Sequence, residues 1–374
     1  MPVASVGLRQ HFLDNLKVLL IVLVILQHAG QPYGPGGAWW IAPEKMPFIN
    51  LLVLGMLFAI NMAFFMGLFF LISAYFLGSS YERKGPGKYL KDRTIRLGIP
   101  ILIFILLIFP ILDFLLYSGN VSFSSFYLNS YLGTSSGQNS VDLGHLWFLF
   151  LLLLFSAAYV IWRALFKRSS LPKIDFPSVK AIFGFIAAMT ILVFIVRIWA
   201  PINSWLPFHL FEPAHFPQYV MMFFAGLMAY RNDWLNKIPA SAAWKWLSIA
   251  SWSFGVFGIM YGVWGDAVLA GGFTVPSLGG AAWESTMCVS MSIGLLALFK
   301  NRFSSTSTFR TALSNSSYAS YLIHVLIIVS LQYLLIDATV PSLAKFAIVS
   351  LVGVPISFIL SDLIRRIPYA NRIL

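Results

Sequence analysis

Charged residues are scarce in this sequence. Only 10% of its 374 residues are Asp, Glu, Lys or Arg, whereas 59% are hydrophobic, and the mean hydropathy is +0.82. Soluble domains carry roughly 25% charged residues, so this composition excludes an ordinary water-soluble protein. A helix needs about 20 apolar residues to cross a bilayer. The chain therefore has room for about ten spans with short loops, and we expect one integral membrane domain over residues 1–374.

Cysteine is nearly absent as well. The one cysteine, Cys288, lies inside an apolar run, which excludes an intrachain disulfide and makes it a poor candidate for an acyl-carrying nucleophile. The sequence also lacks a Gly-rich nucleotide loop, a Cys/His metal array and a Gly-x-Ser-x-Gly elbow. These absences disfavour ATP-driven and serine-hydrolase chemistry, and we expect no metal.

Basic residues outnumber acidic ones, and the formal net charge is +12. The basic residues stand in short loops beside apolar runs, where membrane orientation explains them, so we expect no nucleic-acid partner. With the N-terminus inside, 22 of the 25 Lys and Arg lie on the cytoplasmic side, and only Lys45, Arg197 and Lys345 lie outside. The sequence therefore predicts an all-α polytopic transmembrane helix bundle with both termini cytoplasmic.

Ten apolar segments are the predicted spans. The second one, 50–78, is unusually long, and it is either one tilted helix or a helix with an interfacial piece. Two spans there would invert the sidedness of every later loop, so we expect a single crossing. The segments run approximately over 12–32, 50–78, 97–117, 144–166, 180–200, 216–230, 243–264, 282–299, 311–334 and 343–364.

Ionisable groups inside a bilayer are costly and are functional candidates by default. In the first segment Lys17 and His28 are eleven positions apart, about three helical turns, so both lie on one stripe and are about 16 Å apart along the axis. We expect Lys17 near the cytoplasmic boundary and His28 toward the outer side. The structural alternatives are a lysine that reaches to the interface and a histidine that hydrogen-bonds a neighbouring helix.

Two further segments add polar groups. His145 opens the fourth segment at its outer end, near the depth of His28, so the two imidazoles are expected to converge. In the ninth segment Ser317, Tyr321 and His324 share one helical face, at positions i, i+4 and i+7. These three are candidate substrate-binding residues, and hydrogen bonds between helices are the alternative explanation.

Arg93 and Arg96 stand one turn apart at the entrance to the third segment, within the dense basic loop 79–96. Arginine forks suit phosphates, so the pair is a candidate anion site. Membrane orientation explains any basic residue here equally well.

Taken in order, these residues resemble the membrane-bound acyltransferase-3 family, whose first helix carries a basic residue, ten intervening positions and a histidine. Here Lys17 and His28 form that motif, with lysine in place of the more usual arginine. The other matches are 69–76 (FFLISAYF), 93–100 (RTIRLGIP), 144–149 (GHLWFL) and 317–324 (SYASYLIH), which together cover nearly the whole chain.

One branch of that family is also similar in detail. The patterns 219–226 (YVMMFFAG) and 231–235 (RNDWL) look like the glucan-biosynthesis C branch, which is associated with succinylation of periplasmic glucans. No SGNH-type soluble domain follows, unlike in the peptidoglycan O-acetyltransferases. The membrane unit is therefore expected to complete the transfer itself or to pass the acyl group to another protein.

The resemblance implies an O-acyltransferase of the bacterial cytoplasmic membrane that moves an acetyl or succinyl group from cytoplasmic acyl-CoA to a hydroxyl of an extracytoplasmic glycan or similar acceptor. In this hypothesis Lys17, Arg93 and Arg96 hold the donor phosphates. His28 is the general base, and His145 orients it, acts as a second acid or base, or stabilises the oxyanion. An acyl-histidine intermediate is an alternative route.

The rival from another class is a secondary transporter or flippase for a glycan or lipid-linked solute, with His28, His145 and His324 as binding or proton-relay groups. A basic loop and a deep histidine on one helical stripe favour the enzyme, because a CoA-dependent enzyme needs both and a transporter does not. The acyl group, the acceptor and the oligomeric state are not specified by the sequence.

Overall fold

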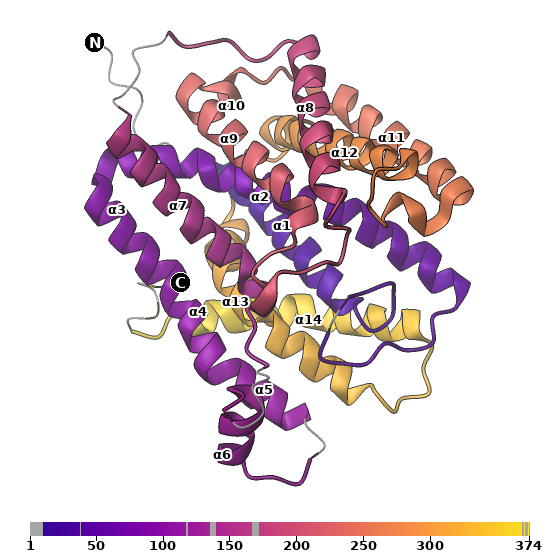
Figure 1. Cartoon of the computed structure of the whole chain (residues 1–374). Coiled ribbons are helices and arrows are strands. Elements are labelled where there is room, and N and C mark those ends of the chain that lie inside the picture. Colours follow the sequence, from indigo (N-terminus) through magenta and orange to yellow (C-terminus); the bar gives the residue numbers. More distant parts are fainter. Residues whose placement is uncertain are drawn as a thin grey trace.

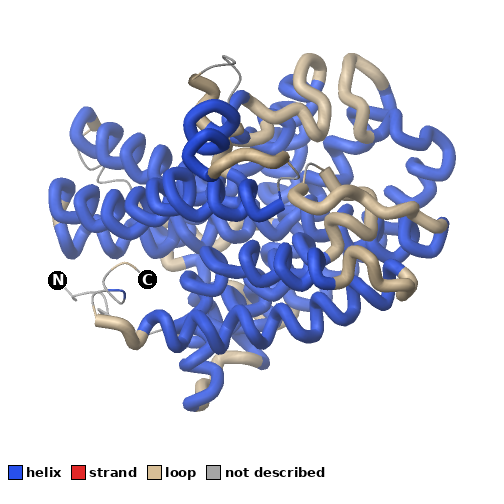
Figure 2. The backbone as a smooth tube through the Cα atoms, turned by 90° about the horizontal axis from the view of Figure 1, so that it is seen from below, coloured by secondary structure: helices blue, strands red, loops and turns tan. Residues whose placement is uncertain are grey.

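The computed structural model describes residues 10–37, 39–116, 119–134, 140–166, 172–368, 370 and 373. Every regular element in these ranges is a helix, and Figure 2 shows a bundle of helices joined by loops. Nine helical segments of the described chain are long and apolar enough to cross a bilayer. The expectation of an all-α polytopic bundle is confirmed.

Two of the nine segments include a short 3₁₀ helix at one end, Gly144–Leu146 or Gly265–Val268. Figure 1 shows the arrangement of the helices. The helices of the bundle are α1 (His11–Ala29), α2 (Phe48–Lys84), α3 (Pro86–Arg93), α4 (Ile99–Ile103), α5 (Phe109–Leu116), α7 (Trp147–Leu165), α8 (Val179–Arg197), α9 (Phe216–Asn232), α11 (Ala242–Trp264), α12 (Val275–Arg302), α13 (Thr308–Leu334) and α14 (Ser342–Arg365). Two short helices, α6 (Phe123–Ser125) and α10 (Trp234–Lys237), lie in connecting segments.

The long second segment is one continuous helix. α2 has 37 residues, which corresponds to about 56 Å of helix and exceeds the roughly 30 Å hydrocarbon core. In Figure 1 it runs across much of the molecule. The expected single crossing at 50–78 therefore agrees with the helix that forms.

The sixth predicted span folds as α9, which has 17 residues and is about 26 Å long, less than one turn short of the hydrocarbon core. It packs along α2. The close approach depends on Gly226, because a Cβ at this position would collide with the backbone oxygen of Leu71. Small residues allow helices to approach in this way inside membranes.

The third segment, Pro86–Leu116, is irregular. Two π-helical stretches, Thr94–Gly98 and Phe104–Ile108, interrupt it between α3, α4 and α5. Each stretch stands just before a proline, Pro100 or Pro110, which has no backbone N–H to donate. A local change of hydrogen-bond register accommodates the missing donors.

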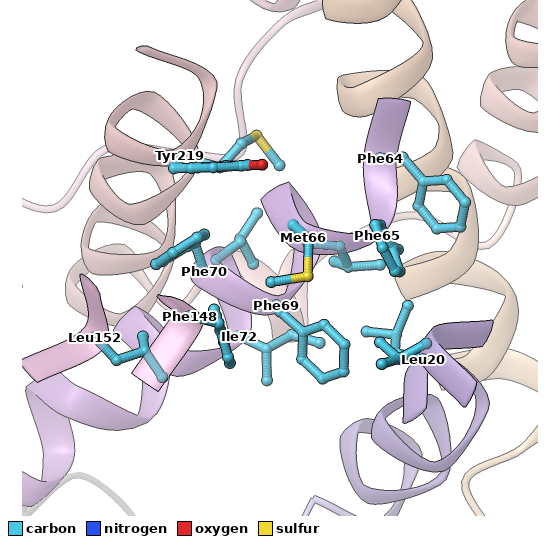
Figure 3. Close-up of a cluster of buried hydrophobic side chains, with 14 of the residues drawn as sticks. Leu20, Phe64, Phe65, Met66, Phe69, Phe70, Ile72, Phe148, Leu152 and Tyr219 are labelled. Carbon is cyan, nitrogen blue, oxygen red and sulfur yellow. The ribbon is translucent and has the colours of Figure 1, made fainter. Parts of the chain in front are cut away.

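Aromatic side chains of α2 fill the centre of the bundle, as Figure 3 shows. The ring of Phe70 lies 4.9 Å from that of Phe148 on α7 and 4.9 Å from that of Tyr219 on α9. Phe69 also contacts Phe148, at 5.6 Å between ring centres. This cluster joins three helices and fixes the position of α7, which carries His145 just before its first residue.

The basic loops meet at one end of the bundle. The Asn15 side chain at the start of α1 donates to the backbone oxygen of Phe303 after α12, at 2.7 Å. The Lys300 ammonium donates to the backbone oxygen of Asn236, at 2.6 Å. Segments that are distant in sequence and rich in Lys and Arg therefore lie side by side, as the positive-inside pattern requires.

Two of the three basic residues expected at the opposite end are buried in ion pairs. Arg197, only 1% exposed, pairs with Glu284, and Lys345, 4% exposed, pairs with Glu44 at 2.7 Å. A buried cation needs such a partner because its desolvation is costly. These departures from the charge pattern therefore have a structural reason.

Candidate active site

The candidate site is built around His28, in the last turn of α1, where the chain leaves the helix at Gly30. The Nδ1 atom of His28 lies 2.8 Å from Nε2 of His324 on α13. α1 and α13 pack against each other, which brings these residues together although 296 positions separate them. The ring of His145 completes the group, at 6.5 Å from the His28 ring and 5.1 Å from the His324 ring.

The partners of His324 determine where its protons lie. Its Nδ1 atom is 2.7 Å from the backbone oxygen of Tyr321. A carbonyl oxygen only accepts, so Nδ1 carries the proton, and in neutral His324 the facing Nε2 is an acceptor. His28 then donates to it through Nδ1–H. Neutral His28 is left with its lone pair on Nε2.

His145 is fixed in a similar way. Its Nε2 atom lies 3.1 Å from the backbone oxygen of Leu322, so Nε2–H donates and the lone pair of the neutral ring is on Nδ1. That Nδ1 atom is buried and has no hydrogen-bond partner in the described structure. The Tyr321 hydroxyl donates to the backbone oxygen of His145. α13 thus holds both the ring and the backbone of His145.

Trp39 and Gln332 fix the other side of His28. The indole of Trp39 stacks on the His28 ring, with 5.1 Å between ring centres and an interplanar angle of 11°. Its Nε1–H donates to Oε1 of Gln332 at 2.7 Å, and Nε2 of Gln332 donates to the His28 backbone oxygen at 3.0 Å. The imidazole is therefore clamped between an aromatic face and His324.

A cavity of about 1040 Å³ opens beside these histidines. His28, His145 and Tyr321 are among the residues that line it, whereas His324 is fully buried behind them. The volume lies at the upper end of the range for small-molecule sites. The cavity is formed largely by the loops and helix ends remote from the basic loops, and no Lys or Arg is among its described lining residues.

A second buried cluster lines another part of the cavity. The Glu284 carboxylate on α12 pairs with Arg197 and accepts from Nδ1–H of His215 at 2.7 Å. Glu212 Oε2 lies 3.6 Å from His215 Nε2, beyond hydrogen-bond length. Burial by itself lowers the pKa of His215, but the carboxylates of Glu284 and Glu212 outweigh it, and that pKa is raised.

The three expected donor-binding residues lie away from this cavity, at the basic end. The Lys17 ammonium is 3.2 Å from the Asp14 carboxylate and 4.3 Å from the centre of the Phe76 ring. Lys17 is a partly exposed side chain beneath His28 on the same helix, as the helical period predicts.

Arg93 and Arg96 are each held against a tyrosine. The Arg93 guanidinium lies 5.5 Å from the Tyr89 ring, and its Nε–H donates to the Tyr89 hydroxyl at 3.2 Å. The Arg96 guanidinium lies 5.5 Å from the ring of Tyr318 on α13. Such stacking holds planar cations in place beside the bundle.

The three candidate substrate residues on α13 have different positions. Tyr321 lines the cavity, and His324 lies behind His28. Ser317 is 6% exposed, and its hydroxyl donates to the backbone oxygen of Leu313 at 2.9 Å, within the same helix. Ser317 is not among the lining residues, so its geometry favours the helix-internal explanation.

Four residues of the site were not predicted from the sequence: Glu212, His215, Glu284 and Gln332. Glu284 could have been found from the sequence, because it is an ionisable residue inside an apolar segment, as His28 is, and such residues are functional candidates. For Arg197 the charge pattern predicts only a side of the membrane, and its buried pair with Glu284 appears only in the structure. Among the described residues, no group of three His, Cys, Asp or Glu side chains is arranged to hold a metal ion.

Comparisons with known proteins identify the family of this chain. No curated protein and no solved structure matches the chain. The family of acyltransferase domains known as acyltransferase-3 matches residues 10–362, which include α1, the arginine pair, His145 and α13. The match supports acyltransferase activity rather than transport. The chain belongs to the acyltransferase-3 family.

Proposed function

We propose that this protein transfers an acetyl or succinyl group from cytoplasmic acyl-CoA to a hydroxyl of an extracytoplasmic glycan or similar acceptor. The proposal is carried by two histidines that line one cavity and whose hydrogen bonds leave each neutral ring with a basic nitrogen, Nε2 of His28 and Nδ1 of His145. Their partners fix both rings in advance, so little reorganisation is needed when a proton moves.

In the proposed reaction the acceptor hydroxyl gives its proton to Nε2 of His28 while its oxygen attacks the thioester carbonyl carbon. The tetrahedral intermediate collapses with cleavage of the carbon–sulfur bond. The thiolate of CoA takes the proton back from the imidazolium, and an ester and free CoA leave. His324 supports the positive charge on His28 by accepting from Nδ1–H throughout.

The donor is proposed to enter from the basic end, with its phosphates near Lys17, Arg93 and Arg96. Support comes from the helical geometry, because Lys17 lies about 16 Å from His28 along α1. Stacking of each arginine on a tyrosine leaves a planar cation beside the bundle, which suits phosphate recognition. A long donor can thus be held at one end and react at the other.

The proposal is tested with purified protein, acetyl-CoA or succinyl-CoA labelled in the acyl group, and a glycan acceptor. We expect thiol release that depends on the acceptor and on His28. Label that stays on the protein in the absence of acceptor, and is lost in His28→Ala, indicates the acyl-histidine route instead. Absence of thiol release from both donors contradicts the acyl-CoA assignment.

A further inference from the structure

The cluster of Glu212, His215, Glu284 and Arg197 is not used by the chemistry proposed above, yet it is one of the most costly features of the bundle. Arg197, His215, Glu212 and Glu284 are between 1% and 3% exposed. Burying several charged groups is rarely a route to stability, since well-packed apolar residues often do better. We therefore ask whether this buried cluster binds a ligand, because stability alone does not explain it.

Two of its groups are positioned to receive a ligand. His215 and Glu212 both line the cavity, and the gap of 3.6 Å between Nε2 and Oε2 is too long for a direct hydrogen bond. His215 Nε2 has no hydrogen-bond partner in the described structure although it is buried. The raised pKa of His215 favours the imidazolium, in which Nε2–H is a donor. A donor and an acceptor therefore stand side by side without satisfying each other.

Both groups are held rigidly from behind. Nδ1–H of His215 donates to Glu284, which Arg197 neutralises. The other oxygen of Glu212 accepts from the backbone N–H of Asn203. Fixed polar groups of this kind cost little entropy when a ligand binds.

The rest of the cavity indicates the chemistry of that ligand. Lys or Arg side chains on the wall would favour an anion, but the described lining residues include neither, and the imidazolium of His215 already donates to Glu284. Aromatic rings form much of the wall and offer flat faces for an apolar ring face. The tryptophans that line it are Trp39, Trp40, Trp147, Trp205 and Trp283.

We infer that Glu212 and His215 bind one hydroxyl of a neutral, polyhydroxylated acceptor, a saccharide, which accepts from His215 Nε2–H and donates to Glu212 Oε2. The inference rests on the proposed function, because it names the acceptor and its site in the same cavity. Aromatic side chains pack against the sugar ring, and Glu212 and His215 select saccharides by the position of the hydroxyl that they bind. A carboxylated saccharide is disfavoured, because Glu212 repels it, the imidazolium of His215 is already paired with Glu284, and no Lys or Arg is among the described lining residues.

The test is direct binding without any donor. Purified protein in a detergent without a sugar headgroup is titrated with a panel of neutral disaccharides and trisaccharides, and with their counterparts oxidised to carboxylates at C6. Binding is followed by tryptophan fluorescence. Sugar-based detergents are avoided because they offer neutral polyols themselves. Two variants test the site, Glu212→Gln and His215→Gln. The glutamine in Glu212→Gln can still accept from the backbone N–H of Asn203. The control is Asp266→Asn, because Asp266 lines the cavity but its carboxylate already accepts from the Tyr261 hydroxyl at 2.7 Å.

We expect at least one neutral saccharide to bind the wild-type protein. Its Kd should rise about tenfold or more in Glu212→Gln and in His215→Gln, as loss of a hydrogen bond to a charged group predicts, with Asp266→Asn unchanged. Thermal unfolding of each variant is measured alongside, and Kd is compared only on folded protein. Equal affinity in wild type and both variants, equal affinity for the carboxylated counterparts, or no binding by the whole panel overturns the inference.

The saccharide-binding experiment uses no acyl donor, so its result can be distinguished from that of the acyl-CoA experiment. If His28-dependent thiol release from acyl-CoA occurs but both variants bind saccharide normally, the proposed function stands and this inference fails. If saccharide binding depends on Glu212 and His215 but no thiol is released from acyl-CoA, the inference stands and the donor assignment fails.

Discussion

His324 Nε2 lies 2.8 Å from His28 Nδ1, and the other nitrogen of His324 is held by the backbone oxygen of Tyr321. His28 lines the cavity, and in its neutral form the lone pair is therefore on Nε2. The arrangement resembles the way a buried acceptor fixes the tautomer of a catalytic histidine in other enzymes. These contacts lead us to propose that His324, predicted from the sequence to contact substrate, positions His28.

The first prediction concerns this positioning. His324→Leu leaves Nδ1–H of His28 without an acceptor and should lower the rate of acyl transfer by about 10–100-fold, the equivalent of one unsatisfied buried donor. His324→Gln offers an amide oxygen to the same N–H and should recover part of the rate. Donor affinity should be unchanged in both variants. A His324→Leu enzyme that is folded and fully active contradicts the positioning role.

The second prediction separates the two ends of α1. His28→Ala should lower transfer by about 10²–10⁴-fold while donor binding survives, since a general base contributes that much. Lys17→Ala should mainly weaken donor binding, and Lys17→Arg should keep much of the activity because the charge is retained. Donor affinity and transfer rate are measured on folded fractions. Near-normal transfer by folded His28→Ala removes the assignment of His28 as the base.

The third prediction concerns the arginine pair. Replacing Arg93 and Arg96 together by alanine should weaken acyl-CoA binding. The loss should be smaller for a truncated thioester donor that has no nucleotide phosphates, because the phosphates are what the guanidinium groups bind. Binding is measured by titration with both donors. Equal acyl-CoA affinity in wild type and double variant counts against a phosphate role.

The fourth prediction is membrane orientation. A reporter fused after residue 374 should read as cytoplasmic, and one inserted in the short connection 335–341 should read as extracytoplasmic, because 22 of the 25 basic residues then lie inside. The buried pairs of Arg197 and Lys345 explain two of the three exceptions. An extracytoplasmic C-terminal reporter is incompatible with this orientation.

The fifth prediction concerns pH. Asp142 lies 3.3 Å from His209, and its hydrogen bond raises the pKa of His209 above the ordinary 6.5. A group whose pKa is raised by folding stabilises the protein fully below its unfolded pKa, and that contribution is lost as pH rises through the folded pKa. The difference in Tm between wild type and Asp142→Asn should therefore shrink as the pH rises from about 5.5 to about 8.5.

The control for this measurement is Asp175→Asn, which removes an exposed carboxylate paired with Lys237 at 3.1 Å. Lysine does not titrate in this pH range, so the Tm difference for this variant should stay constant. The side-chain amide introduced by Asp142→Asn still offers an oxygen to the backbone N–H of Gly144, which Asp142 bonds at 2.8 Å. A Tm difference for Asp142→Asn that is independent of pH contradicts the proposed ion pair.

The sequence by itself determined the helical spans, and their number to within the short helix α9. These follow from local physics, because the cost of placing charge in a bilayer acts on each segment separately and the helical period fixes which residues share a stripe. The same reasoning placed His145 at the end of the fourth span, where its ring does lie within 6.5 Å of the His28 ring.

Only the tertiary structure decided which polar groups became partners. His324 contacts His28 across 296 positions, and Glu284 meets Arg197 and His215 across 87 and 69. Apolar segments carry little information about which helix packs against which, because in lipid many helix pairings bury similar surfaces. Close approaches such as that of Gly226 to α2, together with the geometry of the polar groups, select one arrangement, and that selection creates the cavity between the two clusters.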